Sequence, residues 1–143
     1  MRDRLQIESG GDALVAQKQD LFRQGMASSE PFLPETVELL QELCRSYPLA
    51  VVSSSYRSEV EPPLVRAGIR ALFQMLICGD DVQHFKPSPE PYLLAAERMG
   101  SRQPLVIEDS DAGVAAGRAA GFEVLRVRRV EELAREVREY LAG

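Results

Sequence analysis

Hydrophobic residues along the chain follow two spacings that alternate with each other. Short continuous apolar runs, typical of strands buried on both faces, occupy positions 49–52, 75–78 and 105–107, and a further strand is predicted at 122–127. Between them apolar residues recur at helical spacing, and helices are predicted over 34–45, 89–99, 112–120 and 130–141. Strands that alternate with helices form parallel, right-handed βαβ units, so the pattern predicts an α/β fold with flanking helices.

Two segments fit this pattern less simply. A helix is expected between the serines at 53–55 and Gly68, but Pro62 and Pro63 fall inside it. A proline inside a helix clashes with the carbonyl four residues earlier, so we expect this helix to start late or to be kinked. Residues 12–25 have the apolar spacing of a further amphipathic helix.

Two adjacent carboxylates, Glu108 and Asp109, follow the apolar run at 105–107 directly. A strand that leads into a helix places them at the carboxyl edge of the sheet, where open α/β folds bind ligands. Adjacent carboxylates repel each other unless a cation neutralises them, and hard oxygen ligands favour Mg²⁺. The alternative is an ordinary helix start, which Ser110 or Asp111 caps and whose dipole favours the acidic residues.

Hydroxyl and ammonium groups occupy two other turns. Three serines at 53–55 follow a strand, and hydroxyls with backbone N–H groups at such a turn can cradle an anion. Lys86 stands on a proline-stiffened loop just before the helix at 89–99. Taken alone, the serines are better explained by a polar capping loop, and the lysine by an ordinary surface charge. Their order and spacing together form a more specific pattern.

In this order, Val51–Ser55, Lys86–Tyr92 and Ile107–Gly113 match three successive motifs of a known family. From about Pro31 to Val127 the chain resembles the haloacid-dehalogenase (HAD) superfamily. It is most similar to the β-phosphoglucomutase-like branch of small sugar-phosphate phosphatases and mutases. The resemblance implies an α/β, HAD-like core with a Rossmann-like parallel sheet and flanking helices.

The resemblance also implies roles for individual residues. Ser53 would hydrogen-bond a phosphoryl group, and Lys86 would neutralise that group and the nucleophile. Asp109 would bind Mg²⁺ directly, and Glu108 would support the ion directly or through water. The residues that would line the phosphate or substrate side are Ser54, Ser55 and Arg57.

The first motif of the family, Asp-x-Asp-Gly-Thr, is absent from the sequence. In the family it lies on the first, central strand and supplies the nucleophilic and the acid/base aspartates. Phosphoryl transfer needs an in-line nucleophile as well as charge neutralisation, so we expect the chain to be inactive as it stands. With the first central strand absent, its neighbours are expected to pair directly, to enclose a segment such as residues 4–8, or to accept a strand from another chain.

The N-terminal residues resemble the tail of the family's helical cap domain. Two units are therefore predicted, a remnant of the cap at 1–30 and the HAD-like core at 31–143. On this interpretation Met1 is an internal methionine of a longer gene product. Since the cap selects the substrate in this family, the sequence does not identify the substrate.

Charge and composition narrow the classes of partner. A net charge of −5 argues against nucleic acid and against an anionic membrane. No apolar run approaches the roughly 20 residues of a membrane span, and the first residues do not have the pattern of a signal peptide. Cys44 and Cys78 fit no metal or redox spacing and are expected to be reduced core residues of a cytoplasmic protein. We expect Tyr92 to be a packing or rim residue and the single histidine, His84, to be exposed.

Two functions remain open at this point. The first is a Mg²⁺-dependent phosphohydrolase or phosphomutase that acts on a small phosphorylated metabolite, with a sugar phosphate preferred. The second is a non-catalytic pseudoenzyme that binds phosphate or a phosphorylated ligand, or that assembles with a partner. Unpaired strand edges would also favour a homodimer.

Overall fold

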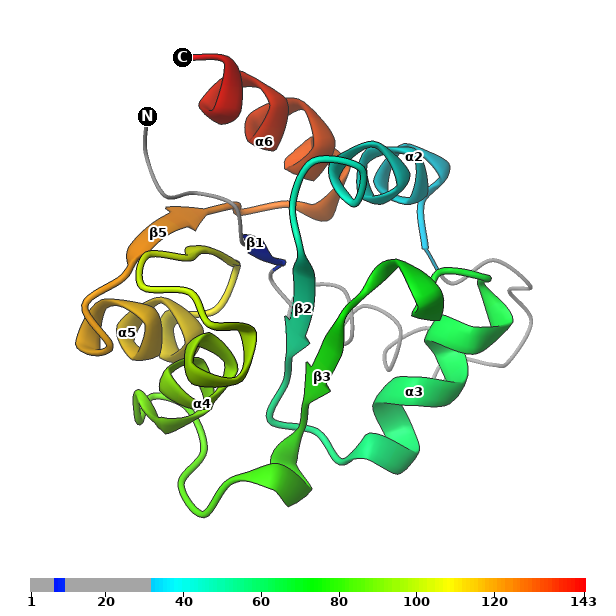
Figure 1. Cartoon of the computed structure of the whole chain (residues 1–143). Coiled ribbons are helices and arrows are strands. Elements are labelled where there is room, and N and C mark those ends of the chain that lie inside the picture. The colour runs from blue at the N-terminus through cyan, green and yellow to red at the C-terminus, as the bar shows by residue number, and fades with distance from the viewer. Residues whose placement is uncertain (1–6, 10–31) are drawn as a thin grey trace.

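The centre of the molecule is a five-stranded sheet, in a computed structural model that describes residues 7–9 and 32–143 (Figure 1). The strand order is β3-β2-β1-β4-β5, and every neighbouring pair is parallel. The strands are β1 (Ile7–Ser9), β2 (Leu49–Val52), β3 (Met75–Ile77), β4 (Leu105–Glu108) and β5 (Glu123–Arg126). The predicted parallel α/β fold is confirmed.

Helices cover both faces of this sheet. They are α2 (Pro34–Leu43), α3 (Arg57–Arg66), α4 (Glu90–Met99), α5 (Asp111–Ala119) and α6 (Leu133–Ala142), and a 3₁₀ turn at Val130–Glu132 leads into α6. Helices α4 and α5 lie side by side and contact β2, β3, β4 and β5. Helices α2 and α6 contact each other, and their apolar residues share a core with those of α3.

Alternation along the strands separates two hydrophobic cores. Leu49 and Val51 of β2 point into the core beneath α2, α3 and α6. Val52 and, on β4, Val106 belong to the core beneath α4 and α5. Successive side chains of a strand point to opposite faces, so each buried strand must be apolar throughout. Because helices cover both faces of the sheet, its buried strands are encoded by continuous apolar runs rather than by alternating apolar and polar residues.

Helix α3 does not start late, despite its two prolines. It begins at Arg57 and continues through Pro62 and Pro63 to Arg66. Its first turn is held from outside the helix, because the Asp80 side chain accepts the Arg57 N–H at 3.1 Å. The Glu59 side chain also accepts the Tyr56 N–H at 3.3 Å. These contacts fix the start of the helix ahead of the prolines, and the periodicity of the sequence contains no sign of them.

The place between β2 and β4 is filled by β1. Ile7 pairs with Leu49 on one side and with Leu105 on the other. Of the three arrangements left open by the absent motif strand, the structure thus shows the one in which an N-terminal segment of this chain lies in the gap. The homodimer through unpaired edges stays a prediction, and β3 and β5 are the outer strands of the described sheet.

The predicted cap remnant at 1–30 and its helix at 12–25 lie outside the described residues, apart from β1. The division into two units therefore stays a prediction. Among the residues that the structure describes, no helix has the length and apolar character needed to cross a membrane.

Candidate functional site

Lys86 is a buried cation at the carboxyl edge of the sheet. Its side chain is 1% exposed. The ammonium donates to the Val52 carbonyl at 2.9 Å and to Glu108 Oε2 at 2.5 Å. Val52 ends β2 and Glu108 ends β4, and these two strands flank β1. The Lys86 ammonium therefore connects the ends of the two strands on either side of the sheet centre.

Glu108 is the anionic partner in this arrangement, and its side chain is fully buried. Oε2 accepts hydrogen bonds from Lys86 and from the Tyr92 hydroxyl. Oε1 accepts the Asp109 N–H at 3.2 Å and the Ser110 hydroxyl at 3.4 Å. A carboxylate transferred from water to the interior loses several kcal/mol of hydration unless it is paired and hydrogen-bonded, and these donors replace that hydration.

Helix α5 leaves room for the Glu108 carboxylate because residue 113 is glycine. A Cβ on Gly113 would lie 2.1–2.4 Å from the three atoms of that carboxylate group. The Ser110 hydroxyl accepts the Gly113 N–H at 2.9 Å, so Ser110 caps the helix as its sequence position allowed. The helix-start interpretation of this segment is confirmed, and it is compatible with a ligand site because the cap and the carboxylates lie at one turn.

The serine turn after β2 is held against the turn after β3. Ser53 is buried, its N–H donates to the Ile77 carbonyl at 2.9 Å, and its hydroxyl accepts the Ser55 N–H at 3.1 Å. The Ser55 carbonyl in turn accepts the Gly79 N–H at 2.7 Å. A Cβ on Gly79 would lie 2.6 Å from the Ser54 carbonyl oxygen, so only glycine permits this close approach. Ser54 and Ser55 are half-buried, while Ser53 follows the residue whose carbonyl binds Lys86.

Asp109 follows Glu108 at the same edge and is half-buried. The structure thus brings Ser53, Lys86 and Glu108 together through the ends of β2 and β4, with Asp109 next in sequence. Their assignment to phosphate and metal binding stays a prediction. The carboxylate of Asp109 fits a hard cation such as Mg²⁺ by its chemistry, whereas both oxygens of Glu108 already accept hydrogen bonds.

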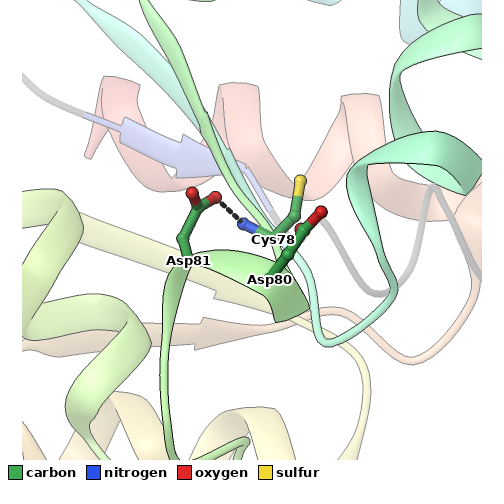
Figure 2. A group of neighbouring side chains, drawn as sticks. All are labelled: Cys78, Asp80 and Asp81. Atoms are coloured by element: carbon green, nitrogen blue, oxygen red, sulfur yellow. Dashed lines mark hydrogen bonds between the residues drawn. The ribbon is translucent and has the colours of Figure 1, made fainter.

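Arg57 contacts the turn after β3. Its guanidinium donates to Asp81 Oδ2 at 2.8 Å and to the Leu76 carbonyl at 3.1 Å. The same Asp81 oxygen accepts the Cys78 N–H at 2.8 Å, and Figure 2 shows this bond beside Asp80. Arg57 therefore fastens the start of α3 to the end of β3, a role that the resemblance did not imply. The pKa of Arg57 is raised despite the opposing effect of partial burial, because Cys78 and Asp81 lie nearby.

Cys78, Asp80 and Asp81 bring one thiol and two carboxylates within 4.8 Å of one another. The thiol is completely buried, and its pKa is raised from 9.0 to about 11. Burial is the main cause, opposed by Arg57 and reinforced by Asp81 and Asp80. Metal binding by cysteine requires the thiolate, which this environment disfavours. Both carboxylates already accept hydrogen bonds from backbone N–H groups. The cluster therefore stabilises the turn after β3 and its contact with the start of α3.

The loop that carries Lys86 is closed by Glu90, which the sequence did not single out. The Glu90 carboxylate accepts the N–H groups of Gln83 at 2.9 Å and His84 at 3.0 Å, and it lies 2.8 Å from His84 Nδ1. The Gln83 N–H is the largest cause of the lowered pKa of Glu90, followed by the bond to the His84 side chain. Glu90 thereby fixes the loop on both sides of Lys86. The sequence feature that could have indicated this role of Glu90 is its position as an acidic residue in the first turn of a helix, directly after a proline-rich loop.

Tyr92 is the second residue that sequence reasoning missed as part of the site. Its side chain packs in the core beneath α4 and α5 as predicted, but its hydroxyl binds the Glu108 carboxylate. The Lys86 ammonium lies 5.0 Å from the centre of its ring. No spacing in the sequence distinguishes such a hydroxyl from one that merely reaches solvent.

This edge of the sheet has the chemistry needed to receive an anion. A buried ammonium is fixed at two strand ends, and the strand-to-helix turn that begins with Ser53 follows one of them, Val52, directly. Ammonium and hydroxyl donors of this kind neutralise and orient phosphoryl oxygens. The carboxylates of Glu108 and Asp109 place negative charge at the same edge.

Comparison with known proteins agrees with this geometry. The family model for haloacid dehalogenase-like hydrolases matches residues 2–121. The chain is 36% identical over 118 residues to the fructose-1-phosphate phosphatase of Escherichia coli K12, covering 81% of this chain and 62% of that protein. It is 40% identical over 93 residues to the phosphoglycolate phosphatase of the same strain, covering 64% of this chain and 36% of that protein. The chain thus spans less than two thirds of the length of these relatives.

Solved structures show the same architecture. A Thermotoga maritima protein provisionally assigned as a beta-phosphoglucomutase is 26% identical, with a TM-score of 0.68 over 75% of this chain and 60% of that one. A hydrolase from Streptococcus pneumoniae shares the fold over 99% of this chain and 100% of that one, with a TM-score of 0.73 at 16% identity. The motifs, the sheet and these matches agree, and the chain belongs to the haloacid dehalogenase-like hydrolase family.

Proposed function

We propose that this chain carries the phosphate-binding and magnesium-binding half of a phosphohydrolase or phosphomutase that acts on a small phosphorylated metabolite. The observation that carries the proposal is the buried Lys86 ammonium, fixed at the ends of β2 and β4, with Ser53 directly after the Val52 that it binds. The relatives named as fructose-1-phosphate and phosphoglycolate phosphatases support this class of substrate, and a sugar phosphate is our preferred member.

Each residue has a separate task in this proposal. Lys86 neutralises the negative charge of the phosphoryl group, and the Ser53 hydroxyl donates a hydrogen bond to one of its oxygens. Ser54 and Ser55 contribute to the same turn. Asp109 would hold Mg²⁺, and Glu108 keeps Lys86 in place and would support the ion directly or through water. When bound, Mg²⁺ supplies further neutralisation of the phosphoryl charge.

The chain as it stands is proposed to bind without turnover. Its 143 residues contain no Asp-x-Asp-Gly-Thr segment, and so no aspartate of that motif to attack phosphorus or to protonate the leaving group. Charge neutralisation alone does not supply an in-line nucleophile. The same observation favours the second candidate, a non-catalytic protein that binds phosphate or a phosphorylated ligand.

A gain-of-function experiment distinguishes the two candidates. The chain alone is assayed for hydrolysis of p-nitrophenyl phosphate and of fructose 1-phosphate with Mg²⁺, and background rates are expected. The Asp-x-Asp-Gly-Thr segment of a family member, with its strand, is then fused in place of residues 1–9, because β1 occupies the central place of the sheet. Hydrolysis by the fusion that requires Mg²⁺ and is lost in its Ser53→Ala form would support the phosphohydrolase. A folded fusion that binds phosphate but stays inactive would favour the non-catalytic candidate.

We also place the protein in the cytoplasm. The two cysteines are unbridged, with Cys78 buried and Cys44 half-buried, as reduced thiols of a cytoplasmic protein would be. The proposed partners are the phosphorylated metabolite and, through strand edges, a second copy of the chain, with no role for nucleic acid or a membrane. The net charge of −5 is consistent with both exclusions.

A further inference from the structure

Tyr92 stands at the centre of the buried charge pair. Its side chain is completely buried in α4. The hydroxyl donates to Glu108 Oε2, the same oxygen that accepts the Lys86 ammonium. The ring lies under that ammonium, 5.0 Å from ring centre to Nζ. One side chain thus touches both members of the pair, through its oxygen and through its face.

We infer that Tyr92 is a positioning residue for phosphate binding, acting through Glu108 on Lys86. The inference deepens the proposed function and rests on it for the nature of the ligand. The Tyr92 hydroxyl fixes the position of Oε2, and Oε2 together with the Val52 carbonyl fixes the Lys86 ammonium. Without the hydroxyl, the carboxylate gains freedom to rotate and the ammonium follows it.

Packing alone does not account for this tyrosine. Its ring belongs to an apolar core with Val52, Ile77 and Val106, where phenylalanine would fill the same volume. A hydroxyl in that core must have a hydrogen-bond partner, and here the partner is a carboxylate. The face of the ring also attracts a cation, because its quadrupole is negative there. The two contacts act on Glu108 and Lys86 respectively, which makes the hydroxyl separable from the ring by mutation.

The position of Lys86 can be observed directly without any ligand. The chain contains two lysines, Lys18 and Lys86, so the ammonium signals in ¹⁵N-lysine NMR spectra are assigned with a Lys18→Arg variant. A buried, hydrogen-bonded ammonium exchanges its protons slowly with water. In Tyr92→Phe we expect the Lys86 signal to shift and its exchange to quicken several-fold. In Tyr47→Phe, a matched loss of one hydroxyl from a residue packed against the other core, we expect no change.

Binding of inorganic phosphate in the presence of Mg²⁺ provides the second readout. Tyr92→Phe is expected to weaken the affinity about tenfold, as the loss of one hydrogen bond to a charged group would. Tyr92→Leu, which also removes the ring beneath the ammonium, is expected to weaken it further. Tyr47→Phe should bind like the unaltered chain. Thermal unfolding of each variant shows that the comparison is made between folded proteins.

Each outcome decides the inference. An unchanged Lys86 signal and unchanged phosphate affinity in Tyr92→Phe would overturn it. A Tyr92→Phe chain that fails to fold would also overturn it, because the hydroxyl would then serve stability. If the unaltered chain binds no phosphate but the Lys86 signal still changes in Tyr92→Phe, the proposed function fails while the positioning of Lys86 by Tyr92 stands.

Discussion

Lys86 and Glu108 are 22 positions apart in the chain, and their side chains meet with Nζ 2.5 Å from Oε2 in a site that excludes solvent. The pair links the loop before α4 to the end of β4, and through the Val52 carbonyl it also holds the end of β2. The Lys86 ammonium, which would neutralise a phosphoryl group, therefore also stabilises the carboxyl edge of the sheet.

Removal of Lys86 is predicted to destabilise the fold strongly. Lys86→Ala leaves the buried Glu108 charge without its ionic partner, and such losses cost about 3 to 5 kcal/mol in the free energy of unfolding. Urea unfolding measures this change. The control is Arg138→Ala, which breaks an exposed pair with Glu42 at 2.8 Å and should cost less than about 1 kcal/mol. Equal losses in the two variants would contradict a buried pair.

Replacement of Gly113 tests the space reserved for the Glu108 carboxylate. The Cβ of Gly113→Ala would lie within 2.4 Å of that group, so α5 or the carboxylate must move. We expect the free energy of unfolding, measured with urea, to fall by about 1 to 3 kcal/mol. This net loss is expected even though alanine favours a helix by about 1 kcal/mol over glycine.

Gly117→Ala is the matched control in the same helix. Its Cβ would meet Val124 at 2.8 Å and Val106 at 3.2 Å, which are core side chains away from the carboxylate. Both variants should lose stability, but only Gly113→Ala should shift the ammonium signal of Lys86 in NMR spectra. A shift of similar size in both would show that general crowding under α5 is responsible.

Cys78 is predicted to make the fold less stable in alkaline solution. Burial raises the pKa of the thiol from 9.0 to about 11, so the folded chain keeps the proton that the unfolded chain loses above pH 9. The free energy of unfolding should therefore fall as the pH rises from about 9 to 11. Cys78→Ser should remove this part of the slope, and an unchanged slope would argue against the raised pKa.

Below pH 9, iodoacetamide should modify the half-buried Cys44 and spare Cys78 in the folded chain.

Glu90 is predicted to hold the Lys86 loop only while it is ionised. Its pKa is lowered from 4.5, first by the Gln83 N–H and then by the bond to His84. The stabilisation is thus present above pH 4.5, where the unfolded carboxyl also ionises, and is lost as the pH falls through the lower folded value. Carboxyl NMR titration should find Glu90 below its usual range. Glu90→Gln should quicken hydrogen exchange at the N–H groups of Gln83 and His84, whereas Glu97→Gln on the same helix should not.

The sequence predicted the fold well because burial on both faces leaves a strong signal. The apolar runs ended within a residue of β2, β3 and β4, the mixed segment at 122–127 contained the partly exposed β5, and Gly100 ends α4 as a left-handed cap. The late start expected for α3 was wrong, since its start depends on Asp80, which lies 23 positions from Arg57, and the kink stays a prediction. The filling of the central place by Ile7–Ser9 could be named as one option, but three residues carry too little periodicity to decide it.

The candidate site was predicted as a set of residues but not as a set of contacts. Motif order placed Ser53, Lys86 and Glu108 at one edge, and the structure brings them there. The pairing of Lys86 with Glu108, and the roles of Tyr92 and Glu90, depend on side-chain directions in three dimensions. Arg57 shows the same limit, because its partner Asp81 lies on another turn, and its implied place on the substrate side stays a prediction.

Calorimetric titration of the chain with inorganic phosphate, with and without Mg²⁺, measures whether the sheet edge at Lys86 binds a phosphoryl group. We expect binding that Mg²⁺ strengthens and that Ser53→Ala weakens about tenfold, with Tyr47→Phe as an unaffected control. Ser53→Ala leaves the Lys86–Glu108 pair in place, so a loss of affinity reports on the phosphate site itself. A folded chain that binds no phosphate under either condition would contradict the account.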